Sequence, residues 1–213
     1  MTTSQLQIYN GALRLLKQLP LATLTDDIAV RYAMDDVWAS RFTDYCLEQG
    51  FWYFAMRSSQ LTNDPTFTTQ FGYRYRFVKP TDWVRTAGVG TDEYLNNPLV
   101  NCLDEAGSWF ADIPVIYTRY VSNDLSYGLN FAIWPATFTL YAEAEMALRI
   151  TPTITASDGL IKIIHDERKK RLTDARSKAA MTESAVFPPT GTWTRSRRGR
   201  SMIDRGNTSR LIG

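Results

Sequence analysis

Apolar residues at the start of the chain follow the period of an amphipathic helix. Between residues 4 and 18 they recur at steps of three and four, at Leu6, Tyr9, Leu13 and Leu16. Ser4 is placed to cap this helix, and Pro20 follows its end. The pattern therefore predicts a first helix over residues 4–18.

A second, longer helix is expected to open at Thr25-Asp26 and to run to about Gln49. Gly50 follows at the position where a left-handed cap is usual. The predicted apolar side of this helix carries Val30, Met34, Val37, Phe42 and Tyr45.

From Phe51 onward the spacing of apolar and polar residues changes from the period of a helix to that of a strand. Residues 73–77 alternate tyrosine or phenylalanine with arginine, and residues 113–120 alternate in the same two-residue period. The segments 88–90, 96–98 and 106–108 are rich in glycine, asparagine and proline, so turns are expected there. Residues 51–131 are therefore predicted to form a β-rich insertion.

Helical periodicity returns after Trp134-Pro135, since proline suits the first position of a helix. An alanine-rich helix is expected over residues 136–150, with Leu140, Ala144, Ala147 and Leu148 on one side and Pro152 breaking it. A last helix is expected from Ser157 or Asp158 to about Met181, with an apolar face made of Leu160, Ile163, Ile164, Leu172 and Ala175. Its charged centre, residues 165–171, is interpreted as a solvated face.

These elements predict an α+β fold with three parts. Residues 1–50 and 132–184 form an antiparallel helical bundle of about four main helices, residues 51–131 form the β-rich insertion, and residues 185–213 form an extended basic C-terminal arm. The length of 213 residues, with 44% hydrophobic and 22% charged residues, suits one such domain.

The C-terminal arm is the strongest local signal for function. It holds six arginines against one aspartate, a net charge of +5, while residues 1–184 carry a net charge of −3. A segment this polar cannot bury enough surface to order by itself, yet it also holds apolar side chains that are costly to leave in water. We therefore predict that it docks on a partner protein, through Phe187, Trp193, Arg195, Arg197, Arg198 and Arg200. Contact with nucleic-acid phosphates and a merely solubilising terminus are the alternatives.

Candidate catalytic groups are few. His165 is the single histidine and lies in the charged stretch of the last predicted helix, so solvation is its expected role. Cys46 and Cys102 suit a reducing compartment, and we interpret them as small core residues. A metal site is not expected from one histidine and two separated cysteines. A cofactor is not expected either, because Gly88-Val89-Gly90 lacks the rest of a dinucleotide fingerprint.

Paired carboxylates are the remaining enzymatic possibility. Glu143 and Glu145 are two residues apart on a predicted helix and should point away from each other. The pairs Asp26-Asp27, Asp35-Asp36 and Asp104-Glu105 are expected on the surface. The N-terminus lacks the pattern of a signal peptide, and no apolar run approaches the length of a membrane span. We therefore predict that the chain is not an enzyme and does not enter a membrane.

Several short motifs, taken in order, resemble the tail tubular protein A family, the head-to-tail adaptors of short-tailed bacteriophages. The motifs are Asn10-Gly11-Ala12-Leu13, residues 41–47 followed by Gly50-Phe51-Trp52-Tyr53-Phe54-Ala55, residues 73–77 followed by Lys79-Pro80-Thr81-Asp82-Trp83, residues 112–120, and residues 131–135 leading into 142–148. The resemblance spans roughly residues 5–183 and leaves the basic arm unmatched. The family typically has a leucine-glycine turn after its first helix, where this chain has Leu16-Lys17-Gln18-Leu19-Pro20.

The resemblance implies a structural virion protein without catalysis, found in the tail at the head-tail junction and assembled in the host cytoplasm. Its members form a ring of twelve subunits below the portal protein, carry the tail nozzle (tail tubular protein B), and let DNA pass through the channel without sequence-specific binding. The alternatives are a nucleic-acid-binding protein that uses the basic arm and, less favoured, a cell-wall hydrolase.

Overall fold

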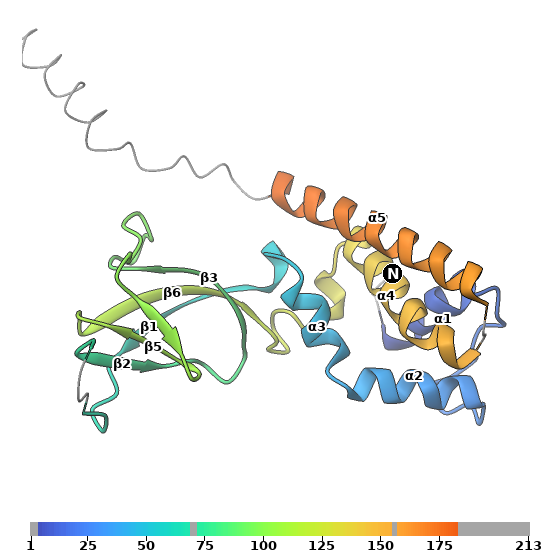
Figure 1. The fold of residues 1–213 in the computed structure, drawn as a ribbon, viewed down its shortest axis with the longest axis horizontal. Helices are drawn as coiled ribbons and strands as arrows, with labels where there is room; N and C mark the ends of the chain where they lie inside the picture. Colours follow the sequence, from blue (N-terminus) through green and yellow to red (C-terminus); the bar gives the residue numbers. More distant parts are fainter. Residues whose placement is uncertain (1–3, 69–71, 155–156, 183–213) are drawn as a thin grey trace, which may run out of the picture. The chain divides into compact units, whose positions relative to one another are not determined.

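The structure is a computed structural model, which describes residues 4–68, 72–154 and 157–182 (Figure 1). These residues form five α-helices and two three-stranded antiparallel sheets, so the fold is α+β as predicted. The helices are α1 (Gln5–Leu15), α2 (Ala29–Ala39), α3 (Phe42–Glu48), α4 (Ala136–Ile154) and α5 (Asp158–Thr182). The strands are β1 (Met56–Thr62), β2 (Tyr75–Val78), β3 (Trp83–Gly90), β4 (Leu103–Glu105), β5 (Ser108–Ala111) and β6 (Val115–Ser122).

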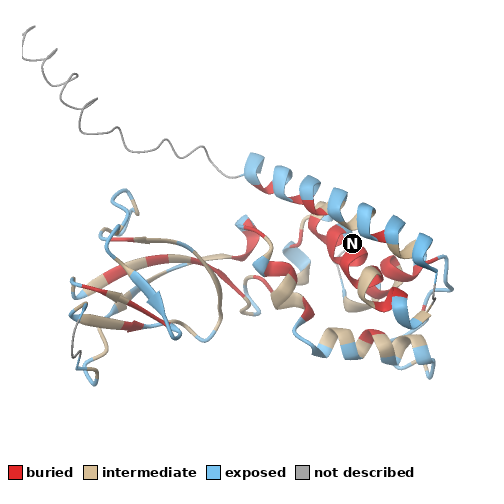
Figure 2. Cartoon of the chain, viewed as in Figure 1, coloured by how far each residue is buried: buried red, intermediate tan, exposed pale blue. Residues whose placement is uncertain are grey.

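Helix α4 is the centre of the helical part and packs against α1, α2 and α5. Its residues 141–147 are all buried, and Figure 2 shows this burial along α4, with exposed residues along the outer sides of α2 and α5. The N-terminus of α1 is capped as predicted, since the Ser4 hydroxyl accepts a hydrogen bond from the Gln7 amide. None of the helices among the described residues is long and apolar enough to span a membrane.

The predicted second helix is wrong in one respect: it is two helices. Helix α2 begins only at Ala29, because the Asp26 carboxylate accepts from the Ala22 and Thr23 amides rather than capping a helix at that point. The chain then breaks at Ser40, whose hydroxyl donates to the Val37 carbonyl oxygen, and at Arg41, which has a left-handed backbone (φ 61°). This break lets both Met34 and Phe42 reach the core.

Two further expectations at helix ends are wrong. Gly50 does not adopt the left-handed conformation; a Cβ at this position would lie 2.9 Å from the Trp52 ring, so close packing is what requires glycine. Helix α4, which was expected to end at Pro152, continues through it to Ile154. Leu140 and Ile163 were also expected on apolar faces, yet both are exposed.

The two sheets have the strand orders β1-β6-β3 and β2-β5-β4. Their facing sides share a small core of Phe77, Trp109, Ala111 and Ile116. The alternation predicted in residues 113–120 is confirmed, because Ile116, Thr118 and Tyr120 are buried while the residues between them are not. Along β2, Phe77 is buried as its alternation requires.

The three turn predictions have different outcomes. Ala106 and Gly107 form the turn between β4 and β5, both with positive φ (47° and 74°). Residues 96–98 lie outside the strands, and the Asp92 carboxylate accepts from the Asn96 and Asn97 amides. The turn expected at Gly88-Val89-Gly90 is wrong: these residues pair with β6 inside β3, next to a register shift between Thr86 and Gly88.

Candidate functional site

The paired carboxylates Glu143 and Glu145 are buried in the helical part, where each meets arginines. Both lie on α4 with side chains 9% and 4% exposed. Their side chains take different partners, in keeping with the prediction that they point apart. A charged face on a central helix needs such partners, because an unpaired buried carboxylate is costly.

Glu145 binds two arginines, Arg149 on its own helix and Arg168 on α5, so it joins α4 to α5 through Arg168. It accepts from Arg149 Nε at 3.0 Å and from Arg168 Nε at 2.7 Å, and Arg168 Nη2 also donates to the Tyr45 hydroxyl at 3.0 Å. Burial, followed by the nearby Glu145 charge, raises the pKa of the Cys46 thiol, which keeps it protonated. Cys46 is therefore a core residue, as predicted.

Glu143 lies between α1 and α5. Its Oε2 is 3.8 Å from Arg171 Nη1, and Arg171 also binds Glu167 on its own helix and the Leu140 carbonyl oxygen. Burial raises the pKa of Glu143, and the charges of Arg171 and Arg14 oppose that rise only in part. The interpretation of residues 165–171 as a solvated face is therefore wrong for Arg168 and Arg171, whereas His165 is exposed as expected.

Sequence reasoning missed this network, although two signals were present. Glu143 and Glu145 interrupt an alanine-rich apolar stretch, and Arg168 and Arg171 stand three residues apart on the following helix. Two acids inside an apolar run indicate burial with cationic partners.

A second polar cluster surrounds Asp82, ahead of β3. Its carboxylate accepts from Arg57 Nη1 at 2.8 Å, from the Ser122 hydroxyl at 2.5 Å and from the Tyr120 hydroxyl at 3.3 Å. Burial by itself would raise the pKa of Asp82, but the hydrogen bonds from Ser122 and Arg57 outweigh it and hold that pKa below its usual range. Burial and then the Asp82 charge raise the pKa of Tyr120 to about 12.

The C-terminal end of α3 binds the β-rich part and α5 together. Arg85 Nη1, on β3, donates to the Glu48 carbonyl oxygen at 2.9 Å, and Arg176 Nε, on α5, donates to the Gln49 carbonyl oxygen at 2.8 Å. Cations suit this end of a helix, because its last carbonyl groups lack intrahelical donors. Asn123, just after β6, adds a further tie by donating to the Asp44 carboxylate at 2.9 Å.

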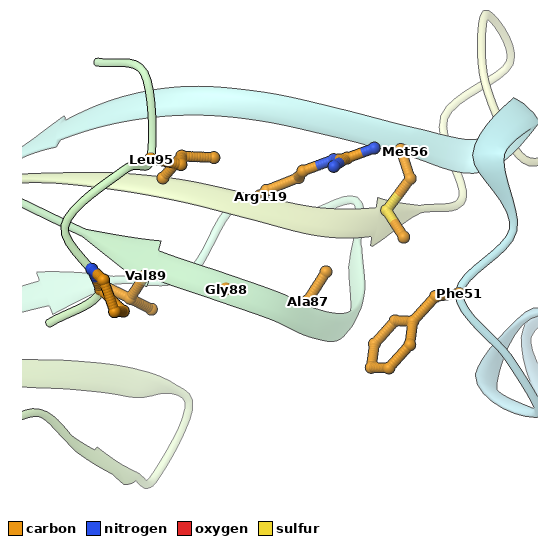
Figure 3. A pocket seen from close by; sticks show the side chains of 8 residues that line it. Phe51, Met56, Ala87, Gly88, Val89, Leu95 and Arg119 are labelled. Atoms are coloured by element: carbon orange, nitrogen blue, oxygen red, sulfur yellow. The ribbon is translucent and has the colours of Figure 1, made fainter. Parts of the chain in front are cut away.

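Two hollows flank Phe51, next to this helix end. One, of about 400 Å³, is lined by Gln49, Gly50, Phe51, Trp52, Arg85, Arg176, Ala179 and Ala180. The other, of about 270 Å³, lies over β3, where Gly88 leaves the strand bare between Ala87 and Val89 (Figure 3). Figure 3 also shows Phe51 at one end of this second hollow, close to Met56, with Arg119 extending along β6.

The remaining predicted site residues lie outside the described part of the chain. These are the docking residues of the arm, Phe187, Trp193, Arg195, Arg197, Arg198 and Arg200. Among the residues that the structure describes, no group of three or more histidine, cysteine, aspartate or glutamate side chains is arranged to hold a metal ion.

No protein-family model and no curated protein matches this chain.

Proposed function

We propose that this chain is a structural virion protein, a head-to-tail adaptor that forms a ring between the portal and the tail nozzle, through which DNA passes. In this proposal residues 1–50 and 132–184 act as a helical bundle, residues 51–131 contact the nozzle, and the arm of residues 185–213 grips the portal. The ring has twelve subunits, as the resemblance implies.

The observation that carries the proposal is the place where the matched motifs meet. Trp52 and Phe54 come from the motif before β1, and Trp134 comes from the motif before α4. All three pack against Phe138, with ring centroids 4.7, 4.9 and 4.6 Å from its own. Motifs far apart in the sequence thus build one aromatic cluster where the helical part leads into the β-rich insertion.

Specific polar contacts hold this junction. Trp52 Nε1 donates to the Leu47 carbonyl oxygen at 3.0 Å, and Trp134 Nε1 donates to the Gly128 carbonyl oxygen at 2.8 Å. The Trp52 bond, with those of Arg85 and Asn123, ties the insertion to α3, and the Trp134 bond holds the segment between β6 and α4. An adaptor under the load of packaged DNA needs this kind of fixed joint between its two ends.

The competing hydrolase interpretation receives no support from its leading candidates. Glu143 and Glu145 bind arginines in the helical core and are only 9% and 4% exposed, so neither faces a substrate. Turnover of peptidoglycan that is lost on changing one carboxylate would establish a hydrolase instead.

A nucleic-acid-binding protein remains the second candidate, because exposed basic side chains on α5 outnumber the exposed acidic ones, Asp158, Asp166 and Asp174. The exposed basic side chains include Lys162, Lys169, Lys170, Arg176 and Lys178. Binding of this kind predicts an affinity for duplex DNA that falls steeply as the salt concentration rises.

The test is a mass measurement of the particle. The purified chain is measured by native mass spectrometry alone and mixed with portal rings encoded by the same genome, and an adaptor is expected to add a ring of about twelve subunits to each portal. Deleting residues 186–213 should abolish that complex. Unchanged binding of the truncated chain would overturn the role of the arm, and no complex with the full chain would overturn the adaptor function.

A further inference from the structure

We propose that the surface around Phe51 docks helix α2 of a second copy of this chain. The Phe51 surface consists of Phe51, Arg85, Gly88, Arg176 and Ala180, and the α2 face consists of Asp27, Ile28, Tyr32 and Asp36. The inference rests on the proposed ring and names the contact between its neighbouring subunits.

The Phe51 surface joins an aromatic ring to two arginines that no described carboxylate neutralises. Phe51 is 44% exposed, and the Arg85 guanidinium stacks over its ring at 4.3 Å from the centroid. Arg85 and Arg176 donate to backbone carbonyl oxygens, and neither takes part in any salt bridge between described residues. The combination of an arginine, an exposed aromatic ring and adjacent hollows is typical of a surface that anchors a protein interface.

Helix α2 offers the complementary chemistry. Ile28 and Tyr32, one turn apart, are 48% and 51% exposed, and the Tyr32 hydroxyl donates to the Asp27 carboxylate at 2.9 Å. Asp27 and Asp36 are exposed beside them, and neither belongs to a salt bridge between described residues. The Arg31 guanidinium lies 3.9 Å from the Tyr32 ring centroid, is largely buried and is paired with Asp35 at 2.5 Å. The exposed face therefore carries Ile28 and Tyr32 in its middle and carboxylates at its ends.

The two surfaces lie on different sides of one subunit, as a ring requires. Helices α2 and α5 flank α4 and α1 in Figure 1, and α5 carries Arg176 of the Phe51 surface. A ring forms when a patch on one subunit fits a different patch on the next and the rotation closes. An acidic, tyrosine-bearing helix meeting an arginine-lined hollow supplies such a pair, with opposite charges to set the orientation.

Charge reversal on each side, and then on both, tests the contact. The variants R85E/R176E and D27R/D36R are expected to reduce ring assembly, alone and on portal rings, at least tenfold in apparent affinity. The fourfold variant that combines them should recover most of the loss, because every interface then carries both reversals. K169E/K170E is the matched control, since both lysines are exposed on α5 outside the Phe51 surface, and it should assemble like the wild type.

Arg85 and Arg176 also hold the end of α3, so a folding defect needs its own check. Tyr32→Ala removes the aromatic anchor from an exposed helix position and should reduce assembly with an unchanged circular dichroism spectrum. Recovery in the fourfold variant is a result that misfolding would not give.

The outcomes separate this inference from the adaptor function. Rings that form equally well in the wild type, both double variants and Y32A would overturn the Phe51–α2 contact and leave the adaptor function standing. Normal rings together with a loss of affinity for a duplex oligonucleotide in R85E/R176E would assign the surface to DNA and overturn the contact as well. A wild-type chain that stays monomeric, alone and with portal rings, would overturn both proposals.

Discussion

The carboxyl group of Glu143 occupies the space that a side chain at Gly11 would need. A Cβ at Gly11 would lie 2.0 Å from Glu143 Cδ, well inside contact distance. With any other residue at this position, either the Glu143 side chain or helix α1 would have to move.

Gly11→Ala is expected to destabilise the protein by about 1–3 kcal/mol, because either Glu143 must leave Arg171 or α1 must move away from α4. Urea unfolding followed by tryptophan fluorescence measures the change. Gly88→Ala is the matched control: a Cβ there meets nothing within 4 Å, so its stability should change by less than about 0.5 kcal/mol. Equal stability of G11A and wild type would contradict the packing of α1 on α4.

Glu145→Gln should cost about 3 kcal/mol of unfolding free energy, because it leaves Arg149 and Arg168 without their carboxylate in a largely buried site. Glu167→Gln serves as the control, since that pair with Arg171 is more exposed and should contribute less than about 1 kcal/mol. Thermal or urea unfolding of both variants measures these free energies. Similar small losses in both would show that the Glu145 network contributes little to folding stability.

The contribution of the Asp82 carboxylate to folding stability should be lost in acid. Its folded pKa lies below the ordinary value of 3.8, so its contribution is present above that pH and is lost as the pH falls through the folded pKa. The stability difference between wild type and Asp82→Asn is therefore expected to be largest near neutral pH and to shrink from about pH 5 downward. A difference that stays constant with pH would argue against the Arg57 and Ser122 contacts.

Glu143 should show the opposite trend. Its folded pKa lies above the ordinary value of 4.5, so ionisation costs stability as the pH rises through that value. The stability of Glu143→Gln relative to wild type is expected to increase from pH 4.5 toward neutral pH, measured by urea unfolding across a pH series. A relative stability that falls over this range would show that Arg171 holds the carboxylate charged, with its pKa lowered.

The two cysteines should differ in reactivity. Cys46 is fully buried, while Cys102 is partly exposed, and burial raises the pKa of each thiol. A maleimide reagent at neutral pH is therefore expected to label Cys102 slowly in the folded protein and to leave Cys46 unlabelled there. In urea it should label both cysteines. Mass spectrometry of peptides identifies the site. Labelling of Cys46 in the folded chain would show that the α3–α4 core opens readily.

Elements with a strong local period could be predicted from the sequence. The helix capped by Ser4, the long last helix, and the strands that contain Phe77 and Ile116 all lie close to where periodicity places them. Their apolar positions repeat at the spacing of the element itself, so the pattern is independent of which other element packs against them. Residue type predicted the burial of Cys46 but was only partly right for Cys102, which was also expected in the core and is partly exposed.

Expectations that rest on a single glycine or proline were wrong at Gly50, Gly88-Val89-Gly90 and Pro152, and the expected apolar faces were wrong at Leu140 and Ile163. Gly88 and Gly90 lie in β3 because β6 supplies their pairing partners. A Cβ at Gly88 would meet nothing within 4 Å, so no neighbouring residue depends on a side chain there. The break at Arg41 has no local signal, since its left-handed backbone is stabilised by the burial of Phe42 and Met34 on either side.

The sequence by itself determined that helices flank a β-rich middle, because the spacing of apolar residues depends only on residues close together in the sequence. Only the tertiary structure decided that Glu143 and Glu145 face the core and that Arg168 and Arg171 turn inward to meet them. A buried charge is tolerated only where an opposite charge from another helix arrives, and that meeting depends on how α4 and α5 pack.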